Sequence, residues 1–425
     1  MNLTRSQIII ISIAGLVVLF FILVFLGVIP GLKDTSSGTP EVQLSFWGVE
    51  NQGVMSDLID AYSKLRPNVS IVYSQIPEET YEESLISALA AGRGPDLLMF
   101  RSSWLPKHSD KIYPAAETQI SLTQVQQLFP KVAEQDFTAS SKIYALPLYI
   151  DTLALIYNKD VFDAKAIAIV PQTWQDFQIL IPKLRELNEQ NQIAKAAAAI
   201  GGSKKSLSQA SDLLDLIMTQ FGSPRLGEIG GIQFGNEGLN AFNFYLQFAN
   251  PASVYYTWND NLTYSLDALS QGKTALIFDY ASVIPKIKSK NPFINIGVAP
   301  MLQFKGANQP IDYADYWGVA VSKQSRNPGW AWDFVIQTTT NSAPSESYLK
   351  NSGRPPALRT LIAKYSNDPN LGVFAKQALT ARSWPKPDSE SIKKIFSNAI
   401  ESVLTGRLSS SQALEQAENE INSIK

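Results

Sequence analysis

The sequence predicts an α/β fold of more than one domain, with helices packed on mostly parallel strands and an N-terminal transmembrane helix before the folded body. The chain has 425 residues, enough for two or three domains at about 100–200 residues each. Its hydrophobic fraction of 45% is typical of a globular protein with large cores. Strand-like and helix-like segments alternate from residue 42 onward, which is the pattern of a sheet covered by helices.

Composition excludes several classes of site. There is no cysteine, so disulfides, cysteine nucleophiles, cysteine-ligated zinc and iron–sulfur clusters are excluded. The single histidine, His108, cannot supply a metal site that needs two or three imidazoles. The formal net charge is −2, which gives no basic field of the kind that attracts nucleic acid.

The N-terminal segment predicts a membrane anchor. Ile8 to Ile29 is an unbroken apolar run without a charge, and about 20 such residues span a bilayer core as a helix. No A-x-A cleavage signal follows, so we interpret residues 1–33 as an uncleaved signal anchor, with a cleaved signal peptide as the alternative. Arg5 before the span favours a cytoplasmic N-terminus and an external body. Residues 34–40 (DTSSGTP) form a polar linker.

The body opens with strands at 42–47, 69–76 and 96–100, separated by helices at 54–65 and 81–91. Two β-α-β crossovers in succession predict a parallel sheet. Ligands of such sheets bind at the carboxyl ends of the strands.

Polar residues and an indole follow the first and third strands. These candidates are Trp47, Glu50 and Asn51, then Arg101 and Ser102. Polar groups beside an indole suit a pocket for a polar small molecule. The alternative is a solvated loop with an incidental tryptophan.

Further elements continue the alternation. Strands are predicted at 154–158, 194–200, 273–278, 294–300 and 317–322, and helices at 174–187, 211–221, 238–248, 265–270, 328–338 and 410–424. Thr173 is a candidate N-cap, and Ser409 with Gln412 fits a capping box.

Five segments, taken in chain order, resemble the extracellular solute-binding proteins of ABC importers, the broad family that includes maltose-binding protein. The segments are LSFW at 44–47 with RPNVSI at 66–71, LAAGRGPDL at 89–97, YALP through LIYNKD at 144–160, PQTW at 171–174, and WGVAVSK at 317–323 with Asn327-Pro328. Together they extend the resemblance over most of residues 41–425.

The resemblance implies a two-lobed periplasmic-binding-protein fold, class II-like, with a hinge and a ligand between the lobes. The chain would cross between lobes near 148–151, 299–302 and 342–346. Lobe 1 would then hold 41–149 plus 301–344, and lobe 2 would hold 150–300 plus 345–425. The chain departs from the family in lacking the lipid-attached cysteine and in reading DYAS at 279–282.

The implied function is capture of a sugar or oligosaccharide at the outer face of the cytoplasmic membrane and its delivery to ABC permease subunits, without a cofactor or catalysis. Stacking on aromatic faces and bonds to polar side chains recognise sugars. The expected stacking residues are Trp47, Trp258 and Trp317, whereas Trp174, Trp330 and Trp332 are expected in the core. The expected polar contacts are Glu50, Asn51, Arg101, Ser102, Asp151, Asp279, Tyr280 and Arg354.

Three other classes remain open at this stage. An enzyme is disfavoured because no G-x-S-x-G, H-E-x-x-H or phosphate-binding glycine loop occurs, and S-x-x-K at 347–350 and 391–394 lacks its companion motifs. A ferric-ion-binding relative of the same architecture would use Tyr255 and Tyr256. The third class is a structural or adhesive surface protein.

Overall fold

A computed structural model describes residues 15, 17–20, 23, 41–226 and 231–424. The expected span at 8–29 lies almost wholly outside these residues. Within the described ranges, no helix is both long and apolar enough to cross a membrane.

The first sheet confirms the predicted parallel start. Its order is β2 (Val69–Gln75), β1 (Val42–Gly48), β3 (Leu97–Arg101), β16 (Trp317–Ser322) and β4 (Ile112–Tyr113), with β7 (Ala145–Pro147) also paired to β16. β1 runs parallel to both β2 and β3, and the crossovers are α2 (Gln52–Leu65) and α3 (Glu78–Ala90). β16 returns late in the sequence and pairs antiparallel with β3.

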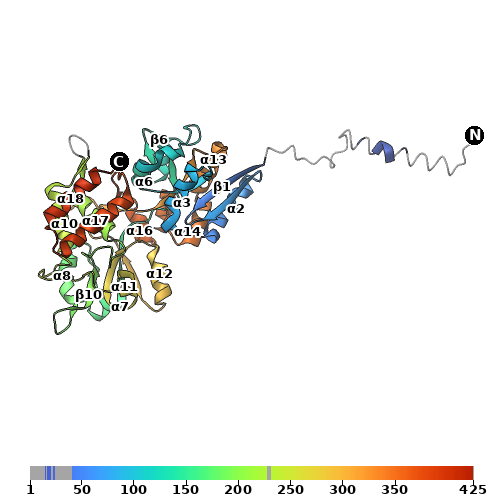
Figure 1. Cartoon of the computed structure of the whole chain (residues 1–425). Coiled ribbons are helices and arrows are strands. Elements are labelled where there is room, and N and C mark those ends of the chain that lie inside the picture. Colours follow the sequence, from blue (N-terminus) through green and yellow to red (C-terminus); the bar gives the residue numbers. More distant parts are fainter. Residues whose placement is uncertain (1–14, 16, 21–22, 24–40, 227–230, 425) are drawn as a thin grey trace, which may run out of the picture.

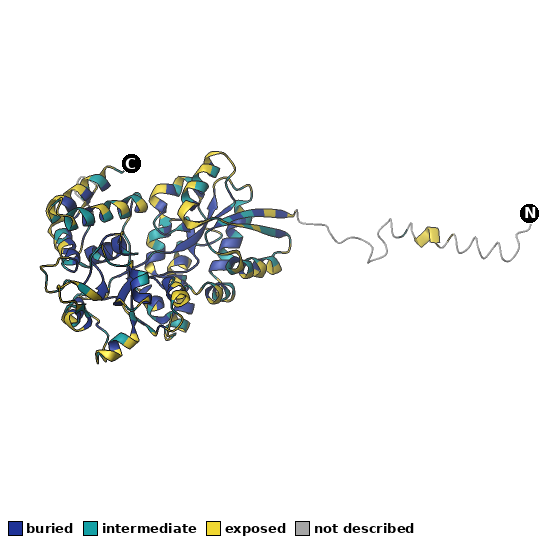
Figure 2. Cartoon of the chain, turned by 60° about the horizontal axis from the view of Figure 1, so that its bottom comes forward, coloured by how far each residue is buried: buried dark blue, intermediate teal, exposed yellow. Residues whose placement is uncertain are grey.

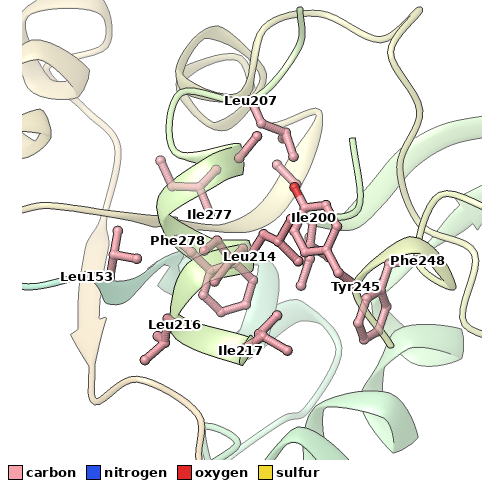
Figure 3. Packing of buried hydrophobic residues seen from close by; sticks show 14 of the residues in the cluster. Leu153, Ile200, Leu207, Leu214, Leu216, Ile217, Tyr245, Phe248, Ile277 and Phe278 are labelled. Atoms are coloured by element: carbon pink, nitrogen blue, oxygen red, sulfur yellow. The ribbon is translucent and has the colours of Figure 1, made fainter. Parts of the chain in front are cut away.

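A second, mixed sheet is built from the middle of the chain. Its order is β14 (Ile296–Ala299), β8 (Ala154–Asn158), β13 (Thr274–Asp279), β10 (Ile193–Ala199) and β9 (Glu186–Leu187). β13 runs parallel to β10 and antiparallel to β8. Figure 3 shows Leu214 and Ile217 of α9 (Ala210–Gln220) packed beside Ile277 and Phe278 of β13.

The other helices cover these sheets or join them. They are α4 (Leu105–His108), α5 (Leu122–Leu128), α6 (Lys131–Phe137), α7 (Lys159–Ala164), α8 (Trp174–Leu184), α10 (Gly235–Leu246), α11 (Ser265–Ser270), α12 (Val283–Lys290), α13 (Pro328–Thr339), α14 (Ser342–Ser352), α15 (Arg359–Tyr365), α16 (Gly372–Gln377), α17 (Ser389–Leu404) and α18 (Ser410–Asn422), with a 3-10 turn at Ser109–Lys111. The remaining short strands are β5 (Thr138–Ala139), β6 (Lys142–Ile143), β11 (Arg225–Leu226), β12 (Ile232–Gln233), β15 (Asp312–Tyr313) and β17 (Ala381–Arg382).

Two local predictions concern helix ends. Thr173 caps α8 by accepting a bond from the Asp176 N–H, and Ser409 with Gln412 forms the capping box of α18, as expected. The helix expected to reach Leu187 instead ends at Leu184, because Arg185 is extended and the following two residues form β9.

Two separate clusters of buried side chains define two lobes, and in Figure 1 α2, α13 and α14 lie in one part of the molecule while α8, α10 and α18 lie in the other. Figure 2 shows each lobe with a buried interior and exposed outer helix faces. The first cluster includes the strands of the first sheet, and the second includes those of the second sheet.

The clusters also correct the expected lobe boundaries. The first crossing lies between Ile150 and Leu153, the second lies between Tyr313 and Ala314, and the third lies after Ala381. Residues 301–313 pack with the second core, where Met301 and Leu302 are buried. Residues 345–365 pack with the first core, because α14 and α15 direct their apolar faces onto it.

The crossing segments are bonded to one another. The N–H of Leu153 donates to the carbonyl of Tyr313 at 3.0 Å, and the N–H of Asp315 donates to the carbonyl of Asp151 at 3.1 Å. β15 pairs with β17, so the third crossing joins the same bundle. This bundle forms a hinge between the lobes.

Candidate functional site

A cavity of about 450 Å³ lies between the two lobes. Its walls come from residues within 102–109 and 135–139 of the first lobe, 313–315 of the hinge, and 383–393 on the side of the second lobe. We call it the interlobe cavity. Its volume falls in the range of about 300–1,000 Å³ that is usual for small-molecule sites.

Asp315 anchors an ion-pair network at this cavity. The Arg101 guanidinium donates from Nε to Asp315 Oδ1 at 2.9 Å, and Lys393 Nζ lies 3.2 Å from Asp315 Oδ2. Lys393 also lies 3.2 Å from the carboxylate of Asp212. Burial disfavours a charged Asp315, but Arg101 and Lys393 hold the pKa of this carboxyl well below its usual value. Asp315 is therefore a fixed negative charge in the wall.

Trp384 supplies an aromatic wall to the same cavity. Its Nε1 donates to Asp215 at 2.8 Å, which fixes the orientation of the indole. Lys386 bonds the same carboxylate at 2.7 Å, donates to Tyr313 Oη at 2.8 Å, and lies 5.3 Å from the centre of the Trp384 ring. The indole is half-buried and lines the cavity, so part of it is available to a ligand.

Asp136 lines the cavity from the last turn of α6. Its two carboxylate oxygens accept bonds from the hydroxyls of Tyr316, at 2.7 Å, and Ser383. Burial raises the pKa of Asp136 to about 6, although the two hydroxyl donors oppose the rise.

A smaller cavity of about 150 Å³ adjoins the first and shares Lys393 with it. Its lining includes Arg101, Lys204, Asp212 and Glu390, beside the first turn of α9. This cavity extends the polar surface between the lobes.

Direct contacts between the two lobes lie at one edge of the two cavities. Ser103 and Ser389 bond through their hydroxyls at 2.8 Å, Lys107 pairs with Asp388 at 2.8 Å, and Arg101 pairs with Glu390 at 3.0 Å. The loop after β3 thus meets the start of α17 across the boundary between the two cores, and the lobes are in contact.

Among the eleven residues expected to bind ligand, Ser102 lines the interlobe cavity and Arg101 lines the smaller one. The other nine line neither of these two cavities.

Two of the expected stacking residues, Trp258 and Trp317, are buried in the cores and line neither cavity. Trp258 is 1% exposed, and its Nε1 donates to Ser206. Trp317 is 4% exposed and packs edge-on against Trp104 and Tyr81 in the first core. β16 is an interior strand of the first sheet, so a side chain at its start is covered.

The other tryptophan expectations are confirmed in part. Trp174 and Trp332 are fully buried, as expected of core residues. Trp330 is half-buried and packs against the first core.

Asp151, Asp279 and Tyr280 are buried around the hinge. Asp151 accepts bonds from the backbone N–H groups of Thr152, Ala281 and Ser282, so it fastens the first crossing to the second lobe. Burial raises its pKa to about 7.

Asp279 accepts bonds from Ser208 and Gln209, and burial raises its pKa to about 6. Tyr280 donates its hydroxyl to Asp212. These hydrogen bonds stabilise the second lobe close to the hinge.

Glu50 and Arg354 form a separate cluster within the first lobe. Their side chains pair at 3.2 Å, and the Arg354 guanidinium lies 4.7 Å from the centre of the Tyr149 ring. Asn51 is the N-cap of α2, and its side chain accepts from the Gly53 N–H. Trp47 is half-buried at the end of β1 and packs against the first core.

Sequence reasoning missed the residues that dominate the cavity, namely Asp136, Tyr313, Asp315, Trp384, Lys386 and Lys393. Trp384 stands in the proline-rich run WPKP, outside any helix or strand. The others lie far apart in the sequence, and only the fold brings them together.

Within the described ranges, no three histidine, aspartate or glutamate side chains are grouped so that they could hold a metal ion. Tyr255 and Tyr256 lie in a turn of the second lobe, where Tyr256 Oη accepts from Asn259. They line neither cavity between the lobes.

Comparison with known proteins identifies a family. Residues 48–337 match the family model described as bacterial extracellular solute-binding protein. A maltotriose-binding protein of Pyrococcus abyssi is 25% identical over 355 residues, covering 78% of this chain and 70% of the relative. A galactooligosaccharide-binding protein of Bacillus subtilis is 24% identical over 403 residues, covering 91% of this chain and 89% of the relative.

Solved structures share the fold. A cyclo/maltodextrin-binding protein in complex with maltotetraose superposes with a TM-score of 0.74 at 20% identity, covering 91% of this chain and 97% of that chain. The sugar-binding protein MalE of Xanthomonas citri superposes with a TM-score of 0.76 at 19% identity, covering 90% and 97%. The two-lobed solute-binding architecture is therefore shared by this chain.

Proposed function

The chain belongs to the bacterial extracellular solute-binding protein family, and from that premise we propose that it captures a sugar or short oligosaccharide between its lobes for an ABC importer. The relatives and solved neighbours named above carry sugar-binding names, which supports this ligand class. Permease subunits are the partners that receive the ligand.

The observation that carries the proposal is the half-buried indole of Trp384 in a cavity whose other walls hold hydroxyls and charged groups. A sugar ring offers an apolar face to an aromatic side chain and hydroxyls to polar groups. Both kinds of partner occur within the interlobe cavity, and they come from both lobes.

We propose that ligand contacts come from Trp384, Tyr313, Asp136 and Ser102 in the interlobe cavity. Arg101 is retained from the sequence-based set as a residue of the adjoining cavity. Trp47, Asn51, Glu50 and Arg354 remain candidates only for a ligand that reaches beyond these two cavities.

We also propose that residues 8–29 anchor the protein to the outer face of the cytoplasmic membrane and that 34–40 link the anchor to the body. The length of the apolar run and the missing cleavage signal support this. Mass spectrometry of the mature N-terminus tests it. A chain that begins near Ser36 and is released into the medium would favour a cleaved signal peptide.

Ligand binding is tested by titrating the soluble body with mono- and oligosaccharides while tryptophan fluorescence and melting temperature are recorded. A ligand at about 100 times its dissociation constant should stabilise the fold by about 2.7 kcal/mol. If the protein binds ferric ion or an amino acid but no sugar, the family assignment still holds and the proposed ligand class is wrong. No ligand at all would favour a non-transport surface protein, and product released from a glycoside would refute our proposal that the protein is not an enzyme.

A further inference from the structure

We propose that the interlobe cavity selects a sugar that carries a protonated amino group, held by Asp136, over neutral and acidic sugars. This inference rests on the proposed function, because it names the chemical class of sugar that the same cavity would take.

Asp136 is a carboxylate without a cationic partner. None of the ion pairs within the described residues includes it, and its two oxygens accept only from the hydroxyls of Tyr316 and Ser383. A carboxylate has about four acceptor positions, so about two remain for a ligand in the cavity that Asp136 lines.

The position of Asp136 costs stability in the ligand-free protein. It sits in the last turn of α6, where the negative end of the helix opposes a carboxylate. The side chain is half-buried, and partial removal from water raises its pKa to about 6. A half-buried carboxyl that lines a cavity and has no ion-pair partner is the kind of group that ligand binding explains.

The neighbouring cations do not form an ion pair with Asp136, because each of them pairs with other carboxylates. Lys386 pairs with Asp215 at 2.7 Å. Lys393 lies between Asp212 and Asp315, both at 3.2 Å. Arg101 is divided between Asp315 and Glu390. Asp136 therefore has no ion-pair partner of its own, and the nearby Lys386, which pairs with Asp215, offsets its charge only in part. The remaining negative charge attracts an ammonium group and repels a uronate.

Two aromatic rings that line the same cavity as Asp136 are compatible with a cationic sugar. The ring centres of Tyr313 and Trp384 lie 4.8 Å and 5.3 Å from the Lys386 ammonium, so these faces already accommodate a positive charge. Asp215 neutralises that ammonium, which limits its repulsion of a second one.

Matched sugar pairs test the inference by calorimetric titration of the intact soluble body near neutral pH. The probes are 2-amino-2-deoxyhexoses against their parent hexoses in the gluco, galacto and manno series, the chitosan disaccharide against cellobiose, and glucuronate. The best amino sugar should bind about tenfold or more tightly than its parent, as a charge-assisted bond predicts. Glucuronate should bind more weakly than glucose.

The variant Asp136→Asn tests the assignment to this residue. It should reduce affinity for the amino sugar about tenfold and change affinity for the neutral parent by less than about threefold. Its melting temperature without ligand should equal or exceed that of the native protein, since an uncompensated carboxylate is removed, and this separates lost binding from lost folding. Asp110→Asn, an exposed aspartate paired with Lys111, is the control for a general charge effect.

Each contrary result is informative. Equal binding of amino and neutral sugars, or an amino-sugar preference that survives Asp136→Asn, would overturn this inference and leave the proposed function intact. Absence of binding by every probe sugar would overturn this inference, and the proposed function would then be decided by the wider titration with mono- and oligosaccharides.

Discussion

The ammonium of Lys393, in the second turn of α17, lies 3.2 Å from the carboxylate of Asp315 in the second hinge crossing. The same ammonium reaches Asp212 on α9 at 3.2 Å. One side chain thus joins the hinge to two helices of the second lobe, and it forms part of the wall of both interlobe cavities.

Replacing Lys393 should weaken the fold and the site together. Lys393→Gln leaves Asp212 without a cation, and a buried carboxylate that loses its partner costs about 1–3 kcal/mol. Urea unfolding measures this loss, and fluorescence titration measures the accompanying loss of sugar affinity. Lys394→Gln is the matched control, because Lys394 is the next residue and is exposed. Equal stability of the two variants would contradict the bridging role of Lys393.

Tryptophan variants should separate the site from the core. Trp384→Ala should weaken sugar binding by about 1–3 kcal/mol, as the loss of an aromatic anchor does, with a smaller effect on folding. Trp317→Ala should lower the free energy of unfolding by about 3–5 kcal/mol, because the indole is 4% exposed and packs on Trp104 and Tyr81. Titration and chemical denaturation of both variants test the contrast. A native-like affinity of Trp384→Ala for sugar would place the stacking surface elsewhere.

Local sequence pattern predicted the elements whose neighbours are close in the chain. The alternation of β1, α2, β2, α3 and β3 was readable, because each strand and helix shows its own period over a short window. α17 was not among the predicted helices, although Ile392, Phe396 and Ile400 follow helical spacing.

Most residues of the candidate site could not be predicted from the sequence, because they lie on segments that are far apart in the chain. Asp136, Asp315 and Lys393 come from α6, the second crossing and α17, and only the hinge brings these segments together. The burial of Trp317 likewise depends on where β16 inserts into the first sheet, which its own sequence does not specify. The later lobe boundaries were misplaced because α14 and α15 pack on the first core, and no local sequence pattern specifies that tertiary contact.

The rim between the lobes should respond to salt. Lys107 pairs with Asp388 of the second lobe at 2.8 Å while about a third of the lysine side chain is exposed, and such pairs contribute about 0.2–1 kcal/mol. Lys107→Gln should therefore speed ligand dissociation by up to about fivefold and enlarge the ligand-free protein in solution scattering. Salt near 1 M should have a similar effect on the native protein. Lys64→Gln, on the exposed side of α2, should leave both quantities unchanged. Identical dissociation rates for the two variants would mean that this pair does not hold the lobes together.

Stability should fall as pH rises from about 5 to about 7.5. Burial raises the pKa of Asp151 to about 7 and those of Asp136, Asp279 and Asp312 to about 6. A carboxyl whose pKa is higher in the folded chain than in the unfolded chain stabilises the fold while protonated, and loses that contribution as pH rises through the folded value. The pKa values of Asp315 and Glu82 are lowered in the folded chain. Their contribution to the stability of the fold is therefore lost only in more acid solution, and it does not cancel this trend.

Melting curves of the ligand-free body across this pH range test the trend, and Asp312→Asn tests its origin. Asp312 is 3% exposed; its Oδ2 accepts a bond from the Thr380 hydroxyl and its Oδ1 accepts one from the Gln303 amide. Asparagine has nearly the same shape, and its carbonyl oxygen can keep the bond from Thr380. The variant should therefore retain the fold and melt with a smaller difference between about pH 5 and about pH 7.5. Asp110→Asn should keep the native difference, because Lys111 lowers the pKa of Asp110 and its ionisation is complete below this range. If the native protein melts at a higher temperature at the upper pH, ionisation of these carboxyls does not destabilise the fold. The predicted direction of the pH dependence would then be wrong.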